Sequence, residues 1–143
     1  MNGAWACAHL VDSYRFTGDR EDLKKSLPIL ESNARFIMSW FEEDDQGHYL
    51  SGPGVSPETG FYAPDGTGPN VLSYVSNGTS HDQLLGRESL RNYIYACGEL
   101  GIRTPTLVKA VQFLKKIPQP AIGSDGRALE LSLIHISEPT SLG

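Results

Sequence analysis

Apolar residues recur every three or four positions over residues 20–41, which is the spacing of one face of an α-helix. Gly18 can end a helix before this segment, and Asp19 is a candidate N-cap for it. Pro28 lies inside the segment, which predicts a first-turn position, a kink or a break nearby. The apolar stripe consists of Leu23, Leu27, Leu30, Ala34, Ile37 and Phe41. A helix with such a wide apolar face requires neighbouring helices to cover it.

Three further segments show helical patterns, at residues 3–16, 81–100 and 104–118. Gly101 ends the second of them, and Thr104 with Pro105 forms an N-cap followed by proline at the first helical position. The buried faces are predicted to contain Trp5, Ala6, Leu10, Val11 and Tyr14, then Leu90, Tyr93, Ile94, Cys97 and Leu100, then Leu107, Val111 and Leu114. Short turns within each pair of helices predict two antiparallel hairpins, which are too few to close a large core.

A connection of about residues 44–80 separates the two hairpins. Loops beyond about 12 to 15 residues are uncommon in compact domains unless they are functional or disordered. This loop is too rich in apolar and aromatic residues for a disordered linker, and the stretches HYLSG and VLSYVS predict short strands. We therefore expect the loop to pack and to form one wall of a site at one end of the helices.

Charge and composition exclude several functions. The net charge of −5 argues against nucleic-acid binding, and no apolar run approaches the roughly 20 residues of a membrane-spanning helix. No signal-peptide pattern opens the chain. Cys7 and Cys97 are predicted to be buried thiols rather than a disulfide or a metal pair. No zinc-like spacing is present, and nothing in the sequence implies a metal or organic cofactor.

The C-terminal string LSLIHISEPT, residues 131–140, resembles the translation of a sequencing adapter read through as coding sequence. Residues 131–143 are therefore expected to be non-native, and residues 1–130 are expected to be a piece of one larger domain. His135 and Glu138 are accordingly not candidate site residues.

Glu58 occupies an unusual position in the long loop, directly after Ser56 and Pro57. Proline restricts its own backbone and that of the preceding residue, so this carboxyl group lies on a stiff segment. The aromatic residues Phe61 and Tyr62 follow closely. A carboxyl group shielded from water by aromatic rings is favoured in its neutral form, which is the form a general acid needs. The alternative is a solvated turn residue or the cap of a short helix.

The stretch NGTSHDQ, residues 77–83, opens the third helix. Thr79 or Ser80 can be the N-cap, with Asp82 in the first turn, and spacing alone favours this capping interpretation. In the functional alternative, His81 and Asp82 point into a cavity at the helix end and hydrogen-bond a polar ligand.

Trp5 and His9 lie one helical turn apart on one face of the first helix. An indole and an imidazole placed in this way can line a sugar site by stacking and hydrogen bonding. They can equally be core packing with a satisfied histidine, which the spacing alone favours.

Four stretches together resemble glycoside hydrolase family 95, the inverting alpha-L-fucosidases built on an (α/α)6 helical barrel. They are GAWACAHLVDSYRFTGD, SPETGF, NGTSHDQ and IGSDGRALE, in the family's order and approximate spacing over residues 3–130. The resemblance implies an all-α fold, part of an (α/α)6 barrel, and hydrolysis of terminal alpha-L-fucosyl linkages. The alternatives are an alpha-L-galactosidase, another (α/α)6 glycosidase, or a non-catalytic helical binding or scaffold module.

The resemblance also assigns roles to individual residues. Glu58 matches the glutamate of the Ser-Pro-Glu motif, which implies a general acid. His81 stands where the family often has methionine, and Leu131 stands where a tryptophan usually follows the glutamate matched by Glu130. The positions assigned to substrate binding are Trp5, His9, Thr79, His81, Asp82 and Glu130.

An inverting glycosidase needs a second group that activates water on the opposite face of the sugar. The family's water-activating residues lie outside this chain, so the chain alone is expected to be inactive and to fold poorly. The implied partners are a fucosylated oligosaccharide or glycan and the remaining parts of the same barrel. The resemblance also favours export of the longer protein.

Overall fold

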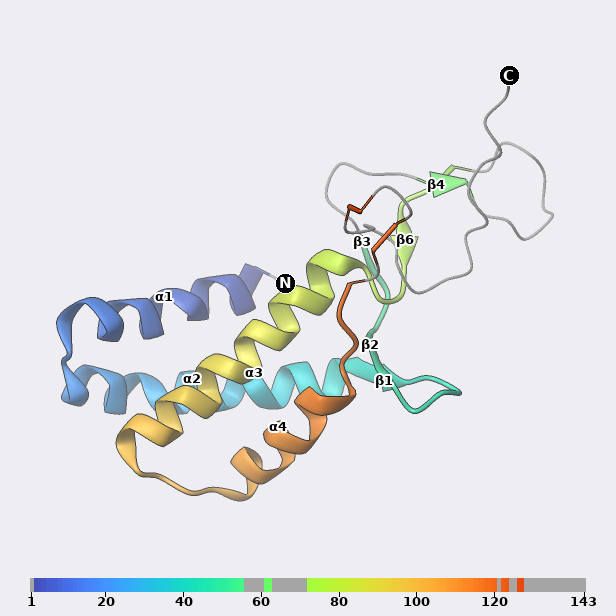
Figure 1. Cartoon of the computed structure of the whole chain (residues 1–143). Helices are drawn as coiled ribbons and strands as arrows, with labels where there is room; N and C mark the ends of the chain where they lie inside the picture. The colour runs from blue at the N-terminus through green and yellow to red at the C-terminus, as the bar shows by residue number, and fades with distance from the viewer. Residues whose placement is uncertain (1, 56–60, 63–71, 121, 124–125, 128–143) are drawn as a thin grey trace.

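A computed structural model of the chain describes residues 2–55, 61–62, 72–120, 122–123 and 126–127. These residues form mostly helix, with short antiparallel strand pairs gathered at one end of the helices (Figure 1). The helices are α1 (Asn2–Thr17), α2 (Arg20–Trp40), α3 (Ser80–Leu100) and α4 (Pro105–Lys116). The strand pairs are β1 (Phe41–Glu43) with β2 (Tyr49–Ser51), β3 (Gly54–Val55) with β6 (Val75–Ser76), and β4 (Phe61–Tyr62) with β5 (Leu72–Ser73). The predicted all-α class is confirmed.

The helix boundaries follow the capping signals in the sequence. The Asp19 carboxylate accepts the backbone N–H groups of Glu21 and Asp22, and so satisfies two donors that the first turn of α2 leaves free. Gly101 has φ of 68° and ends α3 in the left-handed conformation that glycine adopts without strain. Thr104 caps α4 by accepting the backbone N–H of Leu107. Local chemistry therefore places these ends within one or two residues of the prediction.

Pro28 does not break α2. The helix runs without interruption from Arg20 to Trp40, and Pro28 lies on its exposed side. The proline removes one backbone N–H, and an exposed position lets water satisfy the carbonyl left without that donor. Phe41, predicted as the last helical residue, instead begins β1, although it stays in the core.

The helices alternate between two layers. α2 and α3 pack against each other, and each of them also packs against both α1 and α4. The predicted stripe of α2 is buried throughout and joins Leu90, Tyr93, Ala96 and Cys97 of α3 in one core. Two alternating layers of antiparallel helices are the arrangement expected for part of a helical barrel.

Several details of the predicted core are wrong. On α1, Trp5 and Ala6 are exposed although the pattern placed them on the buried face. On α4 the buried residues are Thr106 and Ala110, whereas Val111 of the predicted stripe is exposed and Leu107 is only half-buried. The buried face of α4 is therefore shifted by one residue from its most apolar face. In this orientation the Thr106 hydroxyl accepts a hydrogen bond from Nε of Arg35 on α2 at 3.3 Å. Both cysteines are free, as expected, but Cys7 is only half-buried while Cys97 is fully buried.

The strands tie the long connection to the helices. The Gly52 N–H donates to the carbonyl of Trp40 at 3.1 Å, and the Gly78 N–H donates to the carbonyl of Ser51 at 3.0 Å. These bonds bring the end of α2, the first part of the loop and the start of α3 together. The two predicted strand stretches contribute β2, β5 and β6, whereas β1, β3 and β4 were not predicted.

Candidate functional site

A hollow of about 400 Å³ lies where the loop meets the helix ends. It is formed by the start of α1, the end of α2, the start of α3 and the segment around β3, which Figure 1 shows on the same side of the molecule. Its lining residues are Asn2, Trp40, Pro53, Gly54, Val55, His81 and Asp82. The predicted site at one end of the helices, with the loop as one wall, therefore has a counterpart in the described part of the chain.

Asp82 lines this hollow and is hydrogen-bonded to Thr79, which precedes it in the sequence. Thr79 is the N-cap of α3, and its hydroxyl accepts the Asp82 backbone N–H at 3.2 Å. The same hydroxyl donates to Oδ2 of Asp82 at 3.0 Å, and both residues are buried. Capping and cavity lining, posed as alternatives from the sequence, therefore coexist at Asp82. A carboxylate near a helix N-terminus is also stabilised by the helix dipole.

The backbone at Gly54 comes unusually close to this carboxylate. A Cβ atom added at Gly54 would lie 2.2 Å from Oδ2 of Asp82, so only glycine fits without displacement of the acid. Gly54 pairs with Ser76 across β3 and β6, which fixes the backbone on this side of the hollow. The acid and the loop are thus held against each other.

His81 is exposed and lines the same hollow beside Asp82. A neutral imidazole offers one donor and one acceptor nitrogen, and the adjacent carboxylate offers acceptors. Together with the side-chain amide of Asn2, these groups can hydrogen-bond the hydroxyls of a polar ligand.

Trp5 and His9 face solvent on α1 rather than the core. Trp5 is 64% exposed, and the two ring centroids lie 6.5 Å apart with a tilt of 42° between the planes. The core-packing interpretation favoured by spacing is therefore wrong within the described residues. Trp5 lies one turn along α1 from Asn2, which lines the hollow, but neither Trp5 nor His9 does so itself.

Glu58 and Glu130 lie outside the described residues, as does the whole segment 131–143. In the sequence Glu58 follows β3 by three residues and precedes β4. Its predicted role as general acid stays a prediction, as does the assignment of Glu130.

Sequence reasoning missed several residues of the hollow. Trp40 was not singled out because it belongs to the apolar pattern of α2. In the structure its ring stacks on Phe36 and contacts Phe41 edge-on. Asn2 carries no motif of its own. Gly54 lies in the glycine- and proline-rich run that marked the loop as unusual, so that run was the one signal available for it.

The described residues contain no group of three or more histidine, cysteine or acidic side chains able to hold a metal ion. Within the same residues, every helix falls short of the length and apolarity needed to cross a membrane.

Two comparisons with known proteins bear on this geometry. The model of the glycosyl hydrolase family 95 catalytic domain matches residues 1–135. Alpha-L-fucosidase 2 of Arabidopsis thaliana is 34% identical over 132 residues, which are 91% of this chain. The chain spans only 15% of the length of that relative. The family match covers nearly the whole chain, including α1 to α4 and the hollow at their ends, and on this basis the chain belongs to glycosyl hydrolase family 95.

Proposed function

We propose that this chain is a segment of a glycoside hydrolase that cleaves terminal alpha-L-fucosyl linkages with inversion at the anomeric carbon. The observation that carries the proposal is the 34% identity to an alpha-L-fucosidase over 91% of the chain. The polar hollow at the helix ends supports it, because the carboxylate of Asp82, the imidazole of His81 and the indole of Trp40 are the kinds of group that recognise a sugar. The full-length protein, below, means the longer protein of which this chain is a segment.

Glu58 is proposed as the general acid. In an inverting mechanism one carboxylic acid protonates the leaving glycosidic oxygen, while a second group activates a water molecule on the opposite face of the ring. The Ser-Pro-Glu context keeps the acid on a stiff backbone. The water-activating groups are proposed to lie outside this chain, so the chain alone should show no turnover.

The other candidate residues are proposed to bind the sugar. Asp82 and His81 are proposed to accept and donate hydrogen bonds to ligand hydroxyls at the hollow. Trp5 is proposed to stack on the apolar face of a sugar, with His9 beside it. Thr79 acts through Asp82, because its hydroxyl holds the carboxylate in place. Glu130 completes the set by resemblance alone.

The test is Glu58→Gln in the full-length protein, assayed on a fucosylated oligosaccharide and on an aryl fucoside with a good leaving group. The oligosaccharide should lose roughly 10²- to 10⁴-fold in kcat, since that is the typical contribution of a general acid. The aryl fucoside should lose much less, because its leaving group needs little protonation. Proton NMR of the first product should show the inverted anomer.

Glu42→Gln is the matched control, since Glu42 is an exposed glutamate on β1. Its activity should equal that of the unsubstituted protein. If Glu58→Gln lowers kcat equally on both substrates, Glu58 is not the general acid. If the first product has the same anomeric configuration as the substrate, the enzyme does not invert. Absence of fucosidase activity in the unsubstituted full-length protein would overturn the proposal as a whole.

A further inference from the structure

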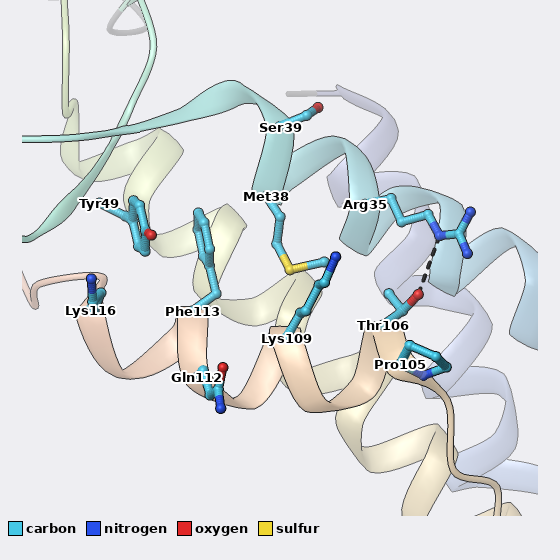
Figure 2. Close-up of a pocket in the computed structure, with 10 residues that line it drawn as sticks. All are labelled: Arg35, Met38, Ser39, Tyr49, Pro105, Thr106, Lys109, Gln112, Phe113 and Lys116. Carbon is cyan, nitrogen blue, oxygen red and sulfur yellow. Dashed lines mark hydrogen bonds between the residues drawn. The ribbon is translucent and has the colours of Figure 1, made fainter.

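We infer that a groove between α2 and α4 binds a carboxylated oligosaccharide, at a site separate from the hollow described above. The groove encloses about 650 Å³, within the usual range for small-molecule sites. It shares no lining residue with the hollow at the helix ends. Figure 2 shows side chains from both helices, and Tyr49 of β2, converging on it.

The groove is cationic on a chain whose net charge is −5. Arg35, Lys109 and Lys116 line it, and no carboxylate is among its described lining residues. Arg35 bonds Glu31 at 3.3 Å and Lys116 bonds Glu43 at 2.7 Å, so two of the cations have acidic neighbours outside the groove. Lys109 makes no ion pair with any described residue. Lys109 is therefore the cation most available to an anionic ligand.

The geometry favours a carboxylate in particular. The planar guanidinium of Arg35 presents paired N–H donors that match the two oxygens of a carboxylate. Its Nε is already oriented by a 3.3 Å hydrogen bond to the Thr106 hydroxyl, drawn in Figure 2. Lys109 extends from the adjacent turns of α4 toward the same opening (Figure 2). A guanidinium and an ammonium on facing helices can bind the two oxygens of one anionic group.

One wall of the groove is apolar. Tyr49 and Phe113 stack with centroids 3.9 Å apart and planes within 3°. Lys116 Nζ lies 5.0 Å from the Tyr49 centroid, and Met38 adds a flexible apolar surface. The exposed parts of this apolar wall can pack against the C–H groups of a sugar ring. The choice of a glycan also rests on the proposed function, whereas the charge of the ligand rests on the groove alone.

The experiment is calorimetric titration of the full-length protein with an oligogalacturonate as the carboxylated probe. Lys109→Gln should weaken binding about fivefold, the upper range for one solvent-exposed ion pair. The double variant Arg35→Gln with Lys109→Gln should weaken it by roughly tenfold or more. Affinity should also fall as ionic strength rises, because the contacts are exposed.

Lys115→Gln is the matched control: it removes the same charge from the same helix, next to Lys116, but Lys115 does not line the groove. Its affinity should be unchanged. The inference would be overturned if Lys115→Gln weakened binding equally, or if no binding were seen at millimolar probe. It would also be overturned if a neutral maltohexaose, a sulfated oligosaccharide or polyglutamate bound as tightly as the oligogalacturonate. The titration involves no turnover, so failure of the fucosidase assay with binding retained would affect only the proposed function.

Discussion

The Thr79 hydroxyl makes two hydrogen bonds to one residue, accepting the backbone N–H of Asp82 at 3.2 Å and donating to its Oδ2 at 3.0 Å. The bonds fix both the first turn of α3 and the direction of a buried carboxylate. Because the same Oδ2 lies against the backbone of Gly54, the N-cap also constrains the space available to β3. Capping therefore supports the candidate site instead of competing with it.

Thr79→Val should loosen the start of α3. The substitution removes an N-cap, worth about 1 kcal/mol, and leaves a buried carboxylate without its donor, worth about 1–3 kcal/mol. Hydrogen–deuterium exchange of the first turns of α3, in the full-length protein, should be faster by roughly 30- to 1000-fold, since each 1.4 kcal/mol is a factor of ten. Thr79→Ser keeps the hydroxyl and should stay close to the unsubstituted rate. Equal acceleration in both variants would contradict a role for the hydroxyl.

Gly54→Ala should destabilise the protein through Asp82. The new methyl group would lie 2.2 Å from Oδ2, so the carboxylate must move away from Thr79, at a cost of about 1–3 kcal/mol. In an Asp82→Ala background the same change should cost little, because the blocking oxygen is gone. A double-mutant cycle by urea denaturation should therefore give a coupling of about 1–2 kcal/mol. Additive costs would show that the two residues do not meet.

The helices could be predicted because their signals are local. The stripe of α2 and the caps Asp19 and Thr104 need only neighbours along the chain, and the structure reproduces them. The contact of Gly54 with Asp82 could not be predicted, because it joins residues from the loop and from α3 that only the tertiary fold brings together.

Exposure was harder to predict than helix formation. A tryptophan at helical spacing favours a core position, yet Trp5 is exposed because no described element packs over that side of α1. On α4 the partner helix, and not the hydrophobicity of α4 itself, selects Thr106 and Ala110 as the buried face. Patterns within one segment therefore predicted the elements better than the surfaces between them.

Gly86→Ala and Gly98→Ala should have opposite effects although both lie in α3. A Cβ at Gly86 would meet the Phe41 ring at 2.5 Å, so Gly86→Ala should cost about 1–3 kcal/mol. Gly98 has nothing within 4 Å, so alanine should stabilise the helix by about 0.5–1 kcal/mol through its higher helix propensity. Urea denaturation of both variants measures this difference. Destabilisation by Gly98→Ala would show an unrecognised neighbour on that face.

Tyr93 should make stability fall at alkaline pH. Burial is the largest cause that raises the pKa of its hydroxyl to about 12, and the hydroxyl lies 2.6 Å from that of Thr104. An unfolded tyrosine titrates near pH 10, so the unfolded chain loses its proton first, and stability falls as pH rises from about 10 to 12. Below pH 10 the contribution is complete. Urea denaturation across this range should show a shallower decline in Tyr93→Phe, and an unchanged decline would assign the pH dependence to other groups.

Trp5→Ala should weaken substrate binding more than folding, because the indole is 64% exposed and contributes little to the described core. Loss of one stacking ring, worth about 0.5–1.5 kcal/mol, predicts a KM for a fucosylated substrate about 2- to 10-fold higher in the full-length protein, with a small change in kcat and Tm. Phe16→Ala is the matched control, since Phe16 is also an exposed aromatic on α1, 90% exposed at the end away from the hollow. It should leave KM unchanged. If Trp5→Ala instead lowers Tm by several degrees with KM unaltered, the indole packs against another part of the full-length protein and does not bind sugar.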